Sequence, residues 1–256
     1  MDASDLKMFE AVARLGGIGR AALELNTVQS NVTARVRSLE QELSTRLFER
    51  HARGVTLFGG DTTSTSGPIS LSLTILGHVA PGQAVRRTGA QPGDGIWATG
   101  TIGDGALGLA VARGRLRDPS GHLLSRYRLP QPRLGLAIAG VASAGMDVSD
   151  GLVQDLGHLC RAGGLAAELD AALVPLSPQA RLAGPEWLAT CLTGGDDYEL
   201  LLAVPPDHDD ALRQAALVAG MAVTRIGCFR SGPPRVMVRG PDGAPMELAV
   251  GGWSHF

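Results

Sequence analysis

Two carboxylates and a hydroxyl lie close together in the segment Asp147-Val148-Ser149-Asp150-Gly151. Apolar residues then recur at helical spacing, which predicts a helix with Asp150 as its N-cap and Gly151 in a sharp turn. Helix N-termini bind anions, and paired carboxylates bind Mg²⁺, which a phosphate group can share. The residues alone also fit a plain capped helix with a polar entry turn, because the motif is short.

Two further segments place glycines directly before an acid. They are Gly59-Gly60-Asp61-Thr62-Thr63 and Gly194-Gly195-Asp196-Asp197-Tyr198-Glu199-Leu200. An aspartate that follows glycines is in most cases a turn residue, so either segment taken alone has a structural explanation. Three such segments in one chain favour a site that binds metal and phosphate.

The composition is that of a globular protein with one large domain or two modest ones, since 44% of the 256 residues are hydrophobic. A net charge of −2 gives no general attraction to nucleic acid or to a membrane. The three cysteines form no C-x-x-C pair, so neither a zinc site nor a disulfide framework is indicated. No signal peptide or membrane span is recognisable, and we expect a cytoplasmic protein.

Strand-like and helix-like segments alternate after residue 59, which predicts α+β or α/β packing and excludes a helical bundle. We expect a helix over residues 134–142 that leads into a loop containing Asp147. The other helices expected are 106–112, 151–161, 187–192 and 209–218, and the strands expected are 69–79, 96–99, 165–169, 198–204, 223–226 and 236–238.

Three helices and a basic hairpin are predicted within residues 1–58. The third helix has its apolar face at Val28, Val32, Val36, Leu39 and Leu43. Its opposite face carries short hydrogen-bonding side chains and then arginines, a pattern that suits base edges and phosphates in a major groove: Gln29, Ser30, Asn31, Thr33, Arg35 and Arg37. An ordinary three-helix bundle with a solvated polar face fits this pattern equally well.

The N-terminal segments closely resemble the DNA-binding domain of LysR-type transcriptional regulators over residues 3–57. The resemblance is carried by Phe9-Glu10-Ala11-Val12-Ala13, Val28-Gln29-Ser30-Asn31-Val32-Thr33 and Leu47-Phe48-Glu49-Arg50. It implies a winged helix-turn-helix in which Gln29, Ser30, Asn31, Thr33 and Arg35 face DNA. It also implies that Arg50 and Arg53 of the wing contact phosphate.

From residue 59 onward the chain resembles thiamine-monophosphate kinase, of the PurM-like ATP-binding superfamily. The three glycine-and-acid segments belong to this resemblance, together with Thr99-Gly100-Thr101-Ile102-Gly103-Asp104, Arg128-Leu129-Pro130-Gln131-Pro132-Arg133-Leu134, Asp155-Leu156-Gly157-His158 and Gly251-Gly252-Trp253-Ser254-His255-Phe256. The resemblance implies transfer of the γ-phosphoryl group of ATP to thiamine monophosphate, which gives thiamine diphosphate.

The same resemblance assigns residues to roles but names no catalytic residue. It implies Mg²⁺ ligands at Asp61, Asp147 and Asp150, and contacts with the co-substrate ATP at Gly60, Asp61, Arg87 and Ser149. It implies contacts with thiamine monophosphate at Asp196 and Trp253, where the cationic ligand could rest on the indole ring.

The resemblance also implies an earlier segment with further acidic motifs, and residues 1–58 contain none of them. We therefore expect three domains, at 1–58 (winged helix-turn-helix), 59–130 (remnant of the ATP-binding domain) and 131–256 (C-terminal PurM-like domain). Strands between residues 69 and 99 are expected to lack sheet neighbours and to leave an exposed apolar edge.

Two function hypotheses follow. The first is a thiamine-monophosphate kinase, whose activity the absent acid cluster could impair. The second is a LysR-type DNA-binding transcriptional regulator whose effector domain has been replaced. Such a regulator needs a dimer to span two half-sites, and that dimer must come from the kinase part.

Overall fold

The structure is a computed structural model that describes residues 3–42, 49–51, 54–56, 60–61, 72–73, 79–248 and 252. The chain divides into two compact units, Met1–Val79 and Ala80–Phe256. Within the described ranges, no helix has the length and apolar character that crossing a membrane requires.

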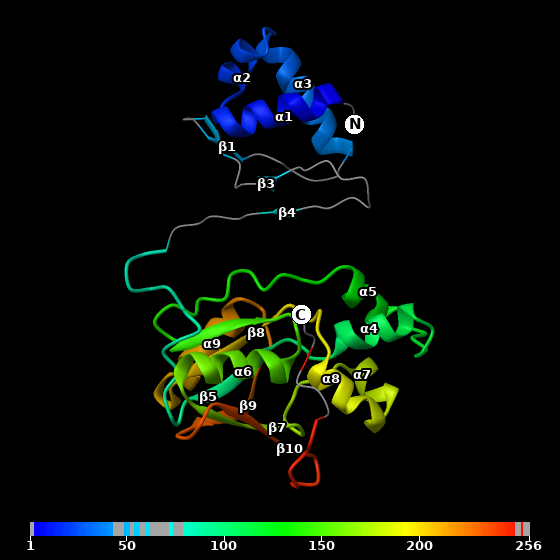
Figure 1. Cartoon of the computed structure of the whole chain (residues 1–256), viewed down its shortest axis with the longest axis vertical. Helices are drawn as coiled ribbons and strands as arrows, with labels where there is room; N and C mark the ends of the chain where they lie inside the picture. The colour runs from blue at the N-terminus through cyan, green and yellow to red at the C-terminus, as the bar shows by residue number, and fades with distance from the viewer. Residues whose placement is uncertain are drawn as a thin grey trace. The chain divides into compact units, whose positions relative to one another are not determined.

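The first unit is built on three helices, α1 (Ala3–Leu15), α2 (Ile18–Glu24) and α3 (Gln29–Glu42), as Figure 1 shows. Their shared core consists of small and β-branched side chains from all three helices: Ala11, Val12, Ala21, Ala22, Val32 and Val36. The three predicted helices are thus confirmed. Val28 differs from its prediction, because α3 begins one residue later and leaves the Val28 side chain 65% exposed.

Short antiparallel strands follow these helices. Strand β1 (Glu49–His51) pairs with β2 (Gly54–Thr56), so the predicted wing hairpin is confirmed. Strand β3 (Gly60–Asp61) pairs with β4 (Ser72–Leu73). Apart from β4 and Val79, the strand predicted over 69–79 lies outside the described residues.

A six-stranded sheet forms the centre of the second unit, in the order β10-β7-β9-β5-β8-β6. Only the β10–β7 pair is parallel, and the other neighbouring pairs are antiparallel. The strands are β5 (Gly95–Thr99), β6 (Ala144–Val148), β7 (Ala166–Asp170), β8 (Glu199–Val204), β9 (Val223–Arg230) and β10 (Arg235–Arg239).

Helices cover both faces of this sheet. Helix α6 (Leu152–Gly163) packs Leu152, Leu156 and Leu159 onto one face. Helix α9 (Asp209–Val218) packs Leu212 against Trp97 on the other face. Four further helices gather at one end of the sheet in Figure 1 and share a small core of their own: α4 (Asp104–Ala112), α5 (His122–Arg128), α7 (Pro178–Ala183) and α8 (Leu188–Thr193).

Two expectations are wrong within this architecture, although the α+β class is confirmed. Strand β5 is fully buried between β8 and β9, so it forms no exposed edge, because its neighbours come from later in the chain. Residues 134–142 form no helix. Gly135 and Gly140 adopt φ values of 85° and 73°, in the left-handed region that an α-helix excludes.

Candidate functional site

The first acidic segment lies where β6 ends and α6 begins. Asp147 is exposed and belongs to β6 itself, which corrects the expectation that it lies in a loop. Ser149 and Asp150 follow as half-buried residues in the connection to α6. The two carboxylates and the hydroxyl therefore lie at the end of one strand of the central sheet.

A single buried carboxylate, that of Asp155 in α6, holds this connection. Its Oδ2 accepts the backbone N–H groups of Ser149, Asp150 and Gly151 at 3.0, 3.1 and 3.2 Å. The prediction of Asp150 as N-cap is wrong, because Gly151 occupies that position without a side-chain cap. Burial raises the pKa of the Asp155 carboxyl, its hydrogen bonds to the amides of Asp150 and Ser149 oppose this, and the charges of Asp150 and Asp147 add to the rise.

The second acidic segment of the site, residues 194–200, lies beside the first, residues 147–151. The N–H of Asp196 donates to the carbonyl oxygen of Ser149 at 2.9 Å, and the N–H of Tyr198 donates to that of Val148 at 2.8 Å. A Cβ on Gly195 would lie 2.2 Å from the Ser149 carbonyl oxygen, so only glycine permits this approach. The structure thus brings Asp147, Ser149, Asp150 and Asp196 together from two distant stretches of the chain.

Sequence reasoning assigned no role to Tyr198, which belongs to the same cluster. Its hydroxyl lies 3.4 Å from Oδ1 of Asp196, and both residues have positive φ, at 53° and 70°. Burial raises the pKa of Tyr198, and the charges of Asp196, Asp147 and Asp150 raise it further. A phenol surrounded by three acids is a hydrogen-bond donor that stays protonated at neutral pH.

The acid next to Asp196 has a different environment. Asp197 is buried and accepts the N–H groups of Gly103 and Gly105, at 2.7 and 2.9 Å, around the start of α4. Burial raises the pKa of Asp197 to about 7, against the effect of these two hydrogen bonds. Asp197 therefore anchors the second segment to α4 and does not face the cluster.

Glu199 is also buried, and it holds two arginines. Nη2 of Arg126 lies 3.1 Å from Oε1 of Glu199. Arg133 donates to both oxygens of the same carboxylate. The hydroxyl of Thr99 donates to its Oε2 at 2.7 Å. One guanidinium nitrogen of Arg126, Nη1, is buried without a partner among the described residues. This network fixes Arg133, and α5 through Arg126, to the strand β8 that contains Glu199.

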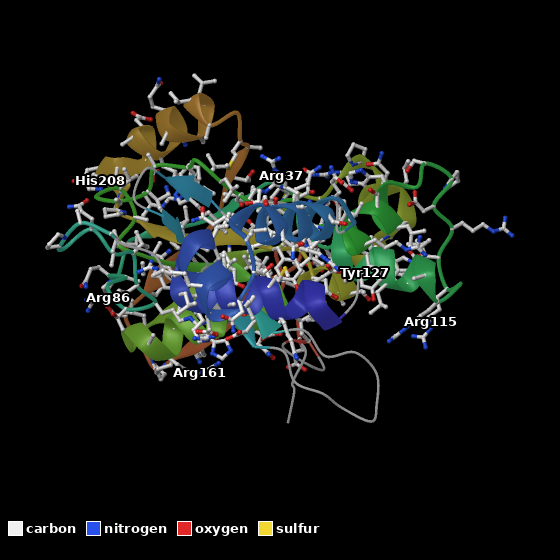
Figure 2. The ribbon with its side chains drawn as sticks, turned by 90° about the horizontal axis from the view of Figure 1, so that it is seen from above. Arg37, Arg86, Arg115, Tyr127, Arg161 and His208 are labelled. Atoms are coloured by element: carbon white, nitrogen blue, oxygen red, sulfur yellow. The ribbon has the colours of Figure 1, made fainter. Side chains whose placement is uncertain are left out.

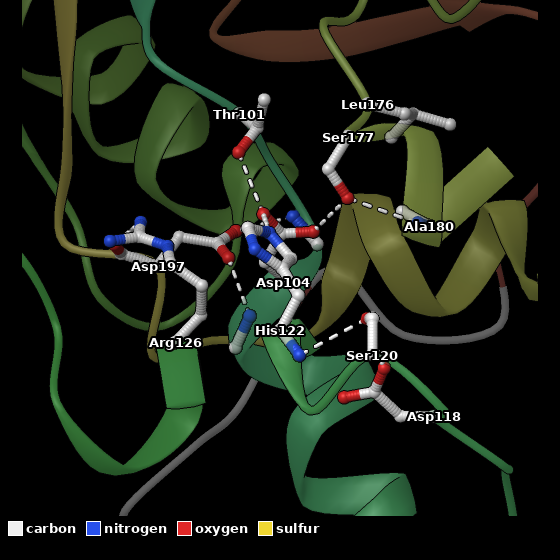
Figure 3. A network of polar contacts seen from close by, with 12 residues as sticks. Thr101, Asp104, Asp118, Ser120, His122, Arg126, Leu176, Ser177, Ala180 and Asp197 are labelled. Carbon is white, nitrogen blue, oxygen red and sulfur yellow. Dashed lines mark hydrogen bonds and ion pairs between the residues drawn. The ribbon is translucent and has the colours of Figure 1, made fainter. Parts of the chain in front are cut away.

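Asp104, the acid of the Thr99–Asp104 motif, is likewise structural. Figure 3 shows the Asp104 carboxylate among Thr101, Ser177 and His122. It accepts the hydroxyls of Thr101 and Ser177 at 2.7 and 2.5 Å, and its Oδ2 lies 3.1 Å from Nε2 of His122. The Ser177 hydroxyl in turn caps α7 by accepting the N–H of Ala180 at 3.0 Å. Asp104 thus ties α4, α5 and α7 together.

The remaining residues assigned by resemblance lie in separate places. Arg87 is exposed, next to Arg86, whose carbonyl oxygen accepts the N–H of Gly145 at the beginning of β6. Gly60 and Asp61 form β3 in the first unit. Trp253 lies outside the described residues, but its neighbour Gly252 abuts the cluster, where an added Cβ would lie 2.7 Å from the Asp150 carbonyl oxygen.

The donor set of the cluster suits Mg²⁺ only in part. Asp147 and Asp150 offer carboxylate oxygens, and Mg²⁺ binds proteins through one or two carboxylates and takes its other ligands from water and phosphates. Within the described parts of the chain, no group of three or more His, Cys, Asp or Glu side chains could hold a metal ion. The residues fit an ion whose other ligands come from water or phosphate, and they do not fit a metal held by this part of the chain alone.

The first unit presents most of its predicted DNA face to solvent. Gln29, Ser30 and Asn31 are exposed at the start of α3, and Thr33 is half-buried. Arg35 differs, since its Nη1 pairs with the Asp5 carboxylate of α1 at 2.8 Å. Arg37 is exposed further along α3, as Figure 2 shows. The backbone of Arg50 lies in β1, and Arg53 lies outside the described residues.

Comparison with known proteins gives two family matches. Residues 3–57 match the family model of the bacterial regulatory helix-turn-helix protein, lysR family. Residues 91–238 match that of the AIR synthase related protein, C-terminal domain.

The proteins that this chain resembles include several thiamine-monophosphate kinases. The thiamine-monophosphate kinase of Caulobacter vibrioides is 42% identical over 210 residues, which cover 78% of this chain and 59% of that protein. The crystal structure of thiamine-monophosphate kinase from Stenotrophomonas maltophilia K279a is 38% identical with a TM-score of 0.63, over 75% of this chain and 61% of the other. The structure of AaThiL complexed with AMPPCP and TMP is 30% identical with a TM-score of 0.55, over 67% of this chain and 54% of the other.

These findings confirm both predicted resemblances. The chain spans less than two thirds of the length of these relatives. The family model for residues 91–238 covers more than half of the chain and includes both acidic segments of the cluster. The chain therefore belongs to the family of AIR synthase related proteins, whose C-terminal domain it contains.

Proposed function

We propose that this chain is a thiamine-monophosphate kinase, which transfers the γ-phosphoryl group of ATP to thiamine monophosphate. The observation that carries the proposal is the meeting of Asp147, Ser149 and Asp150 with Asp196 through the contacts between the two acidic segments. Similarity to thiamine-monophosphate kinases over about three quarters of the chain supports it.

Phosphoryl transfer requires charge neutralisation and alignment more than covalent chemistry. Asp147 and Asp150 would hold Mg²⁺, and the bound ion would neutralise phosphate oxygens. Ser149 would donate its hydroxyl to ATP, and Arg87 would also contact ATP. The resemblance gives Asp61 a role in binding Mg²⁺ and ATP, and gives Gly60 a contact with ATP.

Asp196 and Trp253 would hold thiamine monophosphate, the aspartate by its charge and the indole by stacking on the cationic ring. Tyr198 would orient Asp196, because its hydroxyl lies 3.4 Å from that carboxylate. Asp155 would keep the strand-to-helix connection in place through its three amide hydrogen bonds.

The test is formation of thiamine diphosphate by the purified full chain with Mg²⁺, ATP and thiamine monophosphate. We expect turnover that the pair Asp147→Asn with Asp150→Asn abolishes. Asp170→Asn is the matched control, since Asp170 also ends a strand of the same sheet, and it should leave turnover unchanged. A folded, monodisperse chain that forms no product would overturn the proposal.

A second function, DNA binding by residues 3–57, is favoured by a different observation. The start of α3 exposes Gln29, Ser30 and Asn31, and Arg37 is exposed on the same helix. Gel shifts with duplex DNA at several stated salt concentrations test it, since phosphate contacts make binding salt-dependent. Binding that is equally strong in Gln29→Ala and Asn31→Ala, on every DNA sequence tried, would contradict sequence-specific recognition.

A further inference from the structure

A cavity of about 460 Å³ opens between α6 and the edge strand β10. Its volume lies within the range typical of small-molecule sites. It shares α6 with the acidic cluster but uses residues further along the helix. The described residues that line it are Val153, Gln154, Gly157, His158, Arg161, Pro234, Arg235 and Val236.

The charged groups of this cavity have one sign. Two guanidinium groups, of Arg161 and Arg235, line it, and the described lining residues include no carboxylate. Neither arginine forms an ion pair within the described part of the chain, whereas Arg225 and Arg230 elsewhere on the sheet pair with Asp209 and Glu168. The positive charge of the cavity therefore has no compensating carboxylate among the described residues that line it.

The hydrogen-bonding groups also point to an anion. Nη2 of Arg161 lies 3.1 Å from Nδ1 of His158, and because arginine can only donate, Nδ1 must accept. The His158 proton then lies on Nε2, which becomes one more donor. The N–H groups of Arg235 and the other N–H groups of Arg161 are further donors among the residues that line the cavity.

Gly157 of α6 leaves space for the Arg161 side chain in this cavity. A Cβ on Gly157 would lie 3.2 Å from Nη1 of Arg161, so the guanidinium lies against the glycine. The Arg161 side chain is exposed, so a ligand from solvent can reach it.

A larger cavity, of about 730 Å³, lies on the other face of the sheet, over β7, β9 and β10. It is lined by Glu168 and Asp170 as well as by arginines, so its charges are largely compensated. Of these two cavities, only the one at α6 combines a pocket with uncompensated positive charge.

We propose that the cavity between α6 and β10 is a second anion site, which binds a phosphate-bearing small molecule through Arg161, Arg235 and His158. Arginine matches phosphate oxygens in two-pronged contacts, and two arginines on facing elements can clasp a diphosphate group. The site is separate from Asp147 and Asp150 and requires no metal ion.

The test uses the full chain in EDTA, so that Mg²⁺-dependent binding at the acidic cluster is suppressed. Titration calorimetry with inorganic phosphate, pyrophosphate and ATP distinguishes a free phosphate from a nucleotide as the source of the anion. We expect pyrophosphate to bind, and Arg161→Gln and Arg235→Gln each to weaken it roughly tenfold or more, as for a lost charged hydrogen bond.

Two control variants decide whether a loss of affinity belongs to this cavity. Arg239→Gln removes another exposed arginine from the same strand, outside the cavity, and should leave the affinity within about twofold. Asp147→Asn with Asp150→Asn should also leave it unchanged, whether or not the kinase proposal holds. Affinity that survives both Arg161→Gln and Arg235→Gln, or that falls equally in Arg239→Gln, would overturn the proposal.

Discussion

Replacement of Asp155 by alanine should loosen the connection that carries Ser149 and Asp150. The Asp155 side chain is 1% exposed, and its Oδ2 receives three backbone N–H groups between 3.0 and 3.2 Å. Alanine would leave these three amide groups without an acceptor. No other side chain in this connection accepts them among the described hydrogen bonds.

The size of the effect follows from the number and kind of these bonds. A hydrogen bond to a charged group contributes about 1.5–3 kcal/mol in favourable cases. Here three bonds share one oxygen, and burial, which raises the pKa of the Asp155 carboxyl, costs the carboxylate part of that gain. We therefore expect about 1 kcal/mol per bond, or about 3 kcal/mol for Asp155→Ala. Asp155→Asn keeps a neutral acceptor and should lose about half as much.

Urea unfolding followed by tryptophan fluorescence measures this loss in the second unit alone. All three tryptophans, at 97, 187 and 253, belong to Ala80–Phe256. Asp242→Ala is the control, since Asp242 accepts the N–H of Ala244 in an exposed turn. If Asp155→Ala lowered the free energy of unfolding no more than Asp242→Ala does, the anchoring role of Asp155 would be wrong.

Three other outcomes are expected. Glu199→Ala should lower the free energy of unfolding by about 3–5 kcal/mol in the same assay, because Arg126 and Arg133 would lose the buried carboxylate that pairs with them. Asp197 has its pKa raised to about 7 in the folded state, so it contributes most below about pH 4, and stability falls by about 1.4 kcal/mol per pH unit from there to about 7. A difference between wild type and Asp197→Asn that stays constant over this window would contradict the assignment. Arg37→Ala should reduce by about 1 the slope of log affinity against log salt in DNA gel shifts, and an unchanged slope would exclude a phosphate contact.

The sequence predicts which segments contain the chemistry, but it does not distinguish adjacent acids. Asp196 and Asp197 are neighbours of one type, yet the first faces the cluster and the second is buried at the start of α4. The positive φ angles of Asp196 and Tyr198 set the directions of these side chains. These angles could not be predicted from the sequence, because neither residue is a glycine.

The anchoring of the strand-to-helix connection was missed for a similar reason. Capping rules place the capping acid before the helix and favour Asp150. Gly151 instead adopts φ 125° and ψ 140°, and the acceptor comes from Asp155 inside the helix. Sheet neighbours were missed because they are remote, as in the pairing of Thr99 with Glu199, which lie 100 residues apart.

We propose a division between acids that are not buried and serve phosphoryl transfer, such as Asp150, and buried acids that hold the fold, such as Glu199. Thiamine diphosphate formation and urea unfolding, measured together for Asp150→Asn and Glu199→Gln, test it most directly. We expect Asp150→Asn to lose roughly hundredfold or more of the turnover at an unchanged unfolding midpoint, and Glu199→Gln to lower the midpoint. Full turnover in Asp150→Asn would contradict the claim.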